Sequence, residues 1–156
     1  MKALCQFANT IRDYFCHDSE FEIDLWTKFF QCAISFIKQP SMQLGKFSEN
    51  KRLKILNTYG DMRKNMGMEV KQMWYNLGKH KICFIPHMVG DFLKMALIPE
   101  QELQKHIIPI FFDMIQCEFY RYKIQIHSGA TKLKKGQTKK LVKSKKSISH
   151  FFEYFP

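Results

Sequence analysis

The chain has 156 residues, of which 46% are apolar and 25% are charged. This length suits one domain, and this apolar content excludes a wholly disordered chain. The formal net charge is +11, but residues 1–119 contribute +2 and residues 120–156 contribute +9. The basic character therefore belongs to the C-terminal part, and it does not make the whole chain a nucleic-acid-binding protein.

Five cysteines are present, and they are widely spaced and set mostly in apolar periodic stretches. This pattern indicates reduced core thiols and not a disulfide framework, which favours the cytosol or the nucleus. No apolar run approaches the ~18–20 residues that a membrane span needs, and no secretory signal pattern stands at the N-terminus. We therefore expect a cytoplasmic protein.

The first two predicted helices follow from apolar periodicity. Apolar residues recur at three- and four-residue steps over residues 3–15, which predicts the first helix. Ser19 stands three residues before Glu22, and this capping-box spacing predicts the start of the second. The second helix is expected to stop at Gln39-Pro40, because proline disfavours the helical conformation in the residue before it.

A long third helix is predicted next, with Ser48 as its N-cap and Gly78 after its end. Gly60 and Gly67 each weaken such a helix by up to ~1 kcal/mol, unless they mark a kink or a close helix contact. Three prolines then each open a short apolar run, because proline is tolerated in a first helical turn. The short helices predicted in this way follow Pro86, Pro99 and Pro109 and cover residues 87–97, 100–107 and 110–119.

No segment alternates cleanly between apolar and polar residues, so the sequence predicts an all-α fold. Stacked helical hairpins of the armadillo or HEAT kind fit this layout, although no fixed-period repeat supports them. From residue 120 the composition becomes that of a solvated, disordered basic tail. We therefore divide the chain into a helical scaffold segment, residues 1–119, and a tail, residues 120–156.

The tail holds the strongest electrostatic feature of the sequence, eight lysines within fifteen residues. Such a run displaces counterions from nucleic acid, or binds an anionic membrane at about 1 kcal/mol per residue. Nuclear import and a solvated arm without a partner are the alternatives, so the protein is also expected at membranes or in the nucleus. The candidate residues are Lys132, Lys134, Lys135, Lys139, Lys140, Lys143, Lys145 and Lys146.

The aromatic end of the tail offers a second hypothesis. Ile148, Phe151 and Phe152 fit the pattern of a PIP box, the peptide that docks on the DNA sliding clamp PCNA through an aliphatic plug and two adjacent aromatics. Lys145 stands where that motif has glutamine, and short motifs often match by accident. PCNA therefore stays a lower-ranked partner than membrane or nucleic acid.

A zinc site is the strongest metal hypothesis that the sequence offers. His80, Cys83 and His87 are three and four residues apart, which places an imidazole, a thiolate and an imidazole on one face of an unbroken helix. Pro86 argues against an unbroken helix there. The fourth ligand would have to come from His106 or Cys117. We therefore predict no bound metal.

Catalytic patterns are missing as well. The sequence has no phosphate-binding glycine loop and no nucleophile elbow, and Asp113 and Glu118 are too far apart on a helix to form an acid pair. We predict no catalytic residue and no cofactor, with solvated or capping roles for these two carboxylates. Trp26 and Trp74 are expected in the core, together with the methionines at helical spacing, for which an adaptable binding groove is the less favoured alternative. These methionines are Met66, Met68, Met73, Met88, Met95 and Met114.

Several blocks of sequence occur in the order found in one known family. They are KILNTYGDMR at residues 54–63, MWYNLGKHK at 73–81, FIP at 84–86 and IPIFFDMIQCE at 108–118. With these blocks the chain resembles the DOCK (dedicator of cytokinesis) guanine-nucleotide exchange factors, and within them the Rac-directed subgroup. The resemblance starts near residues 9–15 and reaches about residue 119.

This resemblance implies a helical scaffold that lies between the lipid-binding region and the C-terminal catalytic region of such a factor. The catalytic region and its nucleotide-sensor loop are then expected beyond the end of this chain, and the SH3 region that engages ELMO is expected elsewhere too. Neither a Rac-type small GTPase nor ELMO is therefore expected to bind this segment directly. Beyond residue 119 the sequence departs from the family pattern, which an alternative exon, a read-through or a rearranged gene would explain.

Overall fold

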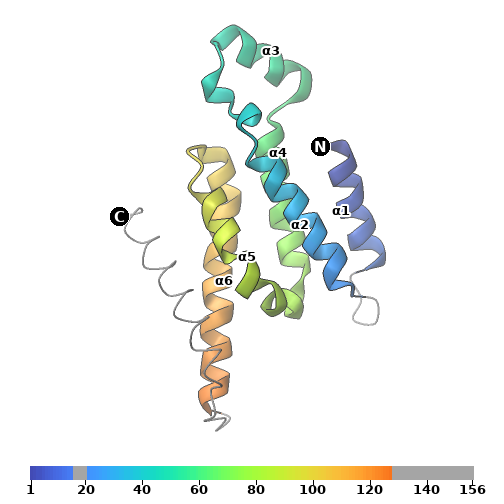
Figure 1. The fold of residues 1–156 in the computed structure, drawn as a ribbon, viewed down its shortest axis with the longest axis vertical. Helices are drawn as coiled ribbons and strands as arrows, with labels where there is room; N and C mark the ends of the chain where they lie inside the picture. The colour runs from blue at the N-terminus through green and yellow to red at the C-terminus, as the bar shows by residue number, and fades with distance from the viewer. Residues whose placement is uncertain (16–20, 128–156) are drawn as a thin grey trace.

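The structure, a computed structural model, describes residues 1–15 and 21–127, and this part is built from helices and contains no strand (Figure 1). The predicted all-α fold of helical hairpins is confirmed. The elements are α1 Lys2–Tyr14, α2 Ile23–Ile37, η1 Pro40–Met42, η2 Leu44–Lys46, α3 Glu49–Tyr59, α4 Met62–Asn76, η3 Gly78–His80, α5 Lys81–Ala96 and α6 Gln101–His127.

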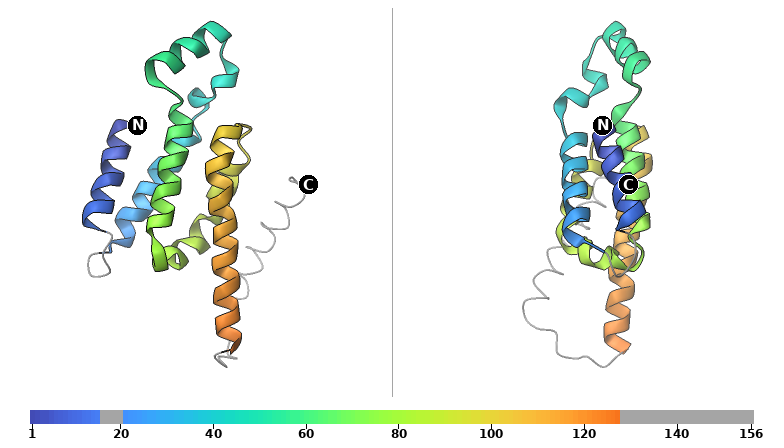
Figure 2. Two further views of the ribbon diagram at one scale, coloured as in Figure 1. Left: turned by 180° about the vertical axis from the view of Figure 1, so that it is seen from behind. Right: turned by 90° about the vertical axis from the view of Figure 1, so that its right-hand side faces the viewer.

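Helix α4 is the centre of the bundle, because it packs against α1, α2 and α6. Helix α1 also packs on α2, and α5 joins α2 to α6. Figures 1 and 2 show α1, α4 and α6 running side by side, with the C-terminal end of α6 extending beyond the other helices. No described helix is long and apolar enough to cross a lipid bilayer.

The interior of the bundle is an aromatic cluster centred on Phe30 of α2. The Phe30 ring meets the rings of Trp74 and Phe92 edge-on, at centroid distances of 6.3 Å and 6.0 Å. These are favoured aromatic geometries, worth about 0.5–1.5 kcal/mol beyond the burial of the rings. Trp26 and Trp74 are both fully buried, which confirms that they are core residues.

The second helix begins later than the capping-box spacing predicted. Glu22 takes the N-cap position of α2, and no side chain caps this helix. The predicted capping box is therefore wrong, and Ser19 lies outside the described residues. The predicted end is right, since α2 stops at Ile37 and Pro40 opens the 3-10 turn η1.

The predicted long third helix is two helices, α3 and α4. Gly60 separates them with a φ of +69°, a conformation that residues with a Cβ rarely adopt. Asp61 then caps α4, because its carboxylate accepts a hydrogen bond of 2.9 Å from the backbone N–H of Lys64. Ser48 does hold the N-cap position of α3, but its side chain makes no capping hydrogen bond.

Gly67 lies at a close contact between two helices, which was one of the two roles proposed for Gly60 and Gly67. A Cβ added at Gly67 would lie 2.7 Å from Cδ1 of Leu103, which is buried on α6. This distance is below normal van der Waals separation, so a glycine lets α4 and α6 approach each other closely. The cost of glycine to the helix is offset by that packing.

Two of the three prolines lie inside helices, which contradicts the predicted helix starts. Pro86 is within α5 and Pro109 is within α6, so two helices replace the three that were predicted. Each proline removes one backbone hydrogen bond. Residues on both sides of each proline are buried, among them Ile85, Met88, Ile107 and Ile110. Tertiary packing therefore outweighs the local preference of proline.

Helix α6 continues across residue 119, the predicted end of the scaffold segment, and ends at His127. Residues 120–127 are thus helical and are not part of a disordered tail. An ion pair of 2.9 Å between Arg121 Nη2 and Glu118 Oε2 links the two sides of the predicted boundary. The prediction of a disordered basic tail for the rest falls on residues 128–156, outside the described residues.

Candidate functional site

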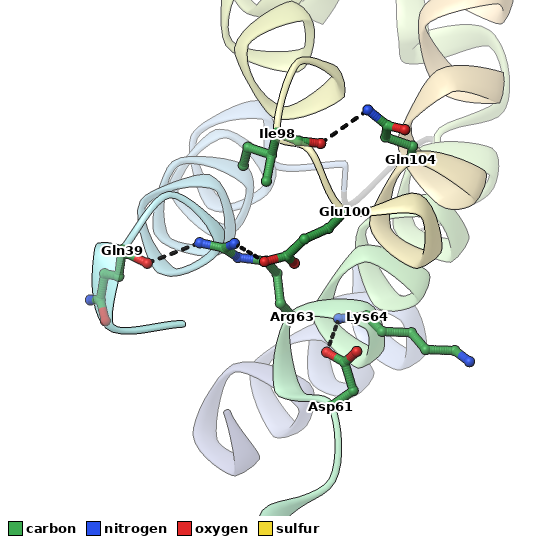
Figure 3. Close-up of polar contacts among 7 residues, drawn as sticks. All are labelled: Gln39, Asp61, Arg63, Lys64, Ile98, Glu100 and Gln104. Carbon is green, nitrogen blue, oxygen red and sulfur yellow. Dashed lines mark hydrogen bonds and ion pairs between the residues drawn. The ribbon is translucent and has the colours of Figure 1, made fainter. Parts of the chain in front are cut away.

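The first polar cluster surrounds Arg63, the one charged residue that is buried in the described part of the chain (Figure 3). Its guanidinium Nη1 forms an ion pair with Glu100, just before α6. Its Nη2 donates a hydrogen bond of 3.0 Å to the backbone carbonyl of Gln39, just after α2. Arg63 of α4 therefore connects three segments that lie far apart in the sequence.

Gln104 fastens the turn between α5 and α6 in the same region (Figure 3). Its side-chain Nε2 donates to the carbonyls of Ala96 and Ile98, at 3.1 Å and 3.0 Å. These carbonyls belong to the last residue of α5 and to a residue just after it, where a helix leaves acceptors without partners. The amide of Gln104 therefore fixes the hairpin that brings Glu100 to Arg63.

The second polar cluster is built around Asp113 of α6. Its Oδ2 accepts a hydrogen bond of 2.7 Å from the indole Nε1 of Trp74 and lies 2.9 Å from Nζ of Lys81. The same Nζ lies 4.7 Å above the ring of Tyr75, a cation–π contact. Burial, with the nearby Asp113 carboxylate, raises the pKa of Tyr75. One carboxylate thus ties α6 to α4 and to the start of α5.

Asp113 was expected in a solvated or capping role, and this expectation is wrong. The sequence did contain a signal, because a buried tryptophan needs an acceptor for its indole N–H. Glu118, the other carboxylate considered, does pair locally with Arg121 on the surface of α6. The contacts of Asp113 with Lys81 and Trp74 are structural, since they join α6 to α5 and α4.

The zinc hypothesis is not supported by the geometry. His80 stacks on the ring of Phe21, with centroids 3.8 Å apart, whereas Cys83 and His87 are both exposed on α5. Within residues 1–15 and 21–127, no group of three or more histidine, cysteine, aspartate or glutamate side chains is placed to hold a metal ion. His106, one of the proposed fourth ligands, lies on α6 against Gly67 of α4.

The cysteines are free thiols but not core residues. Cys32 and Cys83 are exposed, and Cys5 and Cys117 are half-buried, while Cys16 lies outside the described residues. Burial raises the pKa of the Cys5 and Cys117 thiols, which favours the unreactive protonated form. The expectation of core thiols is therefore wrong for Cys32 and Cys83, whereas Cys5 and Cys117 pack against the edge of the core.

The methionines are mostly core, as expected. Five of the six are buried, and only Met68, at 44% exposure, faces solvent. A binding groove lined by methionine is therefore not formed. The buried ones are Met66, Met73, Met88, Met95 and Met114.

An apolar pocket of about 210 Å³ lies between α3 and the 3-10 turns that precede it. Leu44, Phe47, Ile55 and Tyr59 form much of its wall, and Arg63 lies at its edge. The wall contains one carboxylate, Asp61, which already caps α4. The pocket therefore has no pair of groups that would act as acid and base.

All eleven candidate residues of the tail lie outside the described residues, so the structure places none of them and brings none of them together. Binding through this tail stays a prediction. The residues are Lys132, Lys134, Lys135, Lys139, Lys140, Lys143, Lys145, Lys146, Ile148, Phe151 and Phe152.

Comparison with known families agrees with the blocks of sequence noted above. The family described as the dedicator of cytokinesis (DOCK) TPR region matches residues 1–140. The chain belongs to the DOCK family. The match includes all of α6 and extends beyond residue 119, where the resemblance was expected to fade.

Individual DOCK proteins are similar over most of the described helices. Dedicator of cytokinesis protein 3 of Mus musculus and of Homo sapiens is 48% identical over 101 residues, which is 65% of this chain and 5% of each relative. Dedicator of cytokinesis protein 4 of Homo sapiens is 42% identical over 111 residues, 71% of this chain and 6% of the relative. The chain thus spans about one twentieth of the length of these relatives.

Proposed function

We propose that this chain is a non-catalytic helical scaffold segment of a DOCK-like exchange factor for a Rac-type GTPase. The observation that carries the proposal is the use of the charged groups at the centres of its two polar clusters, one buried and one half-buried. Arg63 and Asp113, the centres of the two polar clusters, are both engaged in joining helices. Groups committed to such contacts hold a framework rigid, which is what a scaffold requires.

The role of Rac rests on the resemblance to the Rac-directed subgroup. Under this proposal the exchange reaction belongs to a separate catalytic region, and neither Rac nor ELMO touches this segment. The protein acts in the cytoplasm, where Rac-type GTPases direct the cytoskeleton. The segment contributes by setting the distance and orientation of the regions that flank it in the parent protein.

A nucleotide-exchange assay tests the proposal. Rac loaded with a fluorescent GDP analogue is mixed with the purified 156-residue chain, and release of the analogue is followed by fluorescence. We expect the release rate to equal that of Rac alone, while a DOCK protein of full length accelerates it as the positive control. Far-UV circular dichroism shows that the tested chain is folded. Acceleration by the chain itself would contradict the proposal.

A second function is supported by the concentration of positive charge after residue 120. In this alternative, the helical part carries a basic tail to an anionic membrane, to nucleic acid, or through its aromatic end to PCNA. Membrane and nucleic-acid binding would be electrostatic, so it would weaken steeply as salt is added. The tail would then place the protein at a membrane or in the nucleus.

Two variants of the full chain separate these partners. The first replaces the eight candidate lysines with serine, and the second replaces Ile148, Phe151 and Phe152 with serine. Sedimentation with phosphatidylserine vesicles and titration with duplex DNA should fail for the lysine variant and persist for the other. PCNA binding should show the opposite dependence. Equal binding by the chain and by both variants would refute a function of the tail.

A further inference from the structure

One face of α6 is apolar and is only partly covered by the described helices, because two of its four residues pack against the core and two are exposed. Ile108, Phe112, Ile115 and Phe119 follow one another at steps of four, three and four residues, the spacing of a coiled-coil seam. Phe112 is 45% exposed and Phe119 is 55% exposed, whereas Ile108 and Ile115 are half-buried. We call these four residues the α6 seam. The residues that α6 turns toward the core instead are Leu103, Ile107, Ile110, Phe111 and Met114.

The α6 seam runs along the middle of α6 toward its C-terminal end. Helix α6 packs on α4 and α5, and its C-terminal end extends beyond both of them (Figures 1 and 2). Neighbouring apolar groups in contact with water cost free energy that a packed side chain would recover. A surface of this kind, with aromatic anchors at regular helical spacing, is suited to a short amphipathic segment.

We propose that the C-terminal segment of this same chain, residues 148–155, packs on the α6 seam. In this segment Ile148, Phe151, Phe152 and Phe155 have the i, i+3, i+4, i+7 spacing that gathers apolar groups on one face of a helix. The segment therefore offers one isoleucine and three phenylalanines to a seam of two isoleucines and two phenylalanines. The packing is independent of the exchange activity of any parent protein.

The length of the intervening chain fits this contact. Residues 128–147 separate α6 from the segment, and a free chain of 20 residues has a root-mean-square span of about 22–27 Å. From His127 back to Ile108, the first residue of the seam, a helix rising 1.5 Å per residue covers about 28 Å, close to that span. The eight lysines repel one another and lengthen the span further. The segment can therefore reach every residue of the seam.

Attachment to the same chain also makes a weak contact sufficient. A tether of this kind gives an effective concentration in the millimolar range, so a contact with a Kd of about 1 mM is occupied about half of the time. Occupation at that level slows the opening of the covered part of α6 about twofold. The same aromatic residues form the PIP-box pattern, so packing on α6 would withhold them from PCNA.

Amide hydrogen exchange in the full chain, followed by NMR, tests the proposal in both directions. The tail variant F151S/F152S should exchange at least about twofold faster at residues 112–119. The seam variant F112S/F119S should change the amide chemical shifts of residues 148–155. Leu53→Ser is the matched control, because Leu53 is 48% exposed on α3, which lies at the opposite end of the bundle from the C-terminal end of α6 (Figure 1). It should change neither signal.

Three results would overturn the proposal. The first is exchange at residues 112–119 that is the same in the chain and in F151S/F152S, a variant that leaves the described fold untouched. The second is a set of amide chemical shifts for residues 148–155 that is the same in the chain and in F112S/F119S. The third is protection of the seam that disappears on dilution, because it would assign the seam to a second copy of the chain.

Discussion

Replacing Glu100 with glutamine tests how much the Arg63 cluster holds the bundle together. Arg63 is 1% exposed, so the variant leaves a buried guanidinium without its counter-charge. Removing one partner of a buried ion pair costs about 3–5 kcal/mol. Glu100 is 28% exposed, so solvent screens part of the pair, and we expect the lower end of that range, about 3 kcal/mol.

Removing the other partner should cost less, although it breaks the same ion pair. In Arg63→Met the buried charge is gone, and Glu100 can turn to the solvent that it already contacts. The variant loses the hydrogen bond to the Gln39 carbonyl, which costs stability. It also removes the arginine Nε–H, which is buried without a hydrogen-bond partner, and this removal is favourable. These two effects largely offset each other, so we expect a loss of about 1 kcal/mol.

A double-mutant cycle measured by urea unfolding at 222 nm makes the comparison. The double variant R63M/E100Q should lose about 1 kcal/mol, as R63M does, which gives a coupling free energy of about 3 kcal/mol. Glu102→Gln is the matched control, because its surface ion pairs with Lys64 and Lys105 are screened by salt. A loss in R63M as large as that in E100Q would refute the reasoning, provided that the urea dependence stays unchanged.

Three further predictions concern other helix contacts. Gly90→Ala adds its methyl group in open space and should stabilise the chain by up to about 1 kcal/mol. Gly67→Ala meets Leu103 and should be about 1–3 kcal/mol less stable than Gly90→Ala in urea unfolding. Asp113→Asn keeps an acceptor for Trp74 but loses the charge facing Lys81; we expect a loss of about 1.5 kcal/mol, measured in the same way. Burial lowers the pKa of His106 below 6.5, so stability should be complete above that pH and decrease as the pH falls toward the folded pKa; His106→Gln should flatten this pH dependence of the midpoint.

Apolar periodicity predicted the fold class and most of the core. The pattern works because a helix that packs on one side repeats its buried positions every three or four residues, as residues 3–15 show in α1. The same pattern correctly predicted that Trp26 and Trp74 are buried. The sequence offered two interpretations of Gly60 and Gly67, a kink or a close helix contact. The structure interrupts the helix at Gly60 and has a close helix contact at Gly67.

Proline positions were less informative than the sequence rules suggested. The rules describe the local cost of a missing hydrogen bond, and they do not include the core that forms around Pro86 and Pro109. The same limit applies to the polar clusters. Arg63 and Glu100 are 37 residues apart in the sequence, and Trp74 and Asp113 are 39 apart. No local pattern pairs residues across such separations.

The change of composition near residue 119 shows why charge is a poor guide to a structural boundary here. After that residue acidic side chains nearly vanish and basic ones dominate, which is typical of a solvated arm. The C-terminal end of a helix, however, favours cations, because the backbone carbonyls leave partial negative charge there. Lys123 lies close to the last turn of α6, where this effect is favourable, and Arg121 pairs with Glu118 one turn earlier. A deletion that tests the tail should therefore begin after His127, because a cut at residue 119 would remove the end of α6 and its Glu118–Arg121 ion pair.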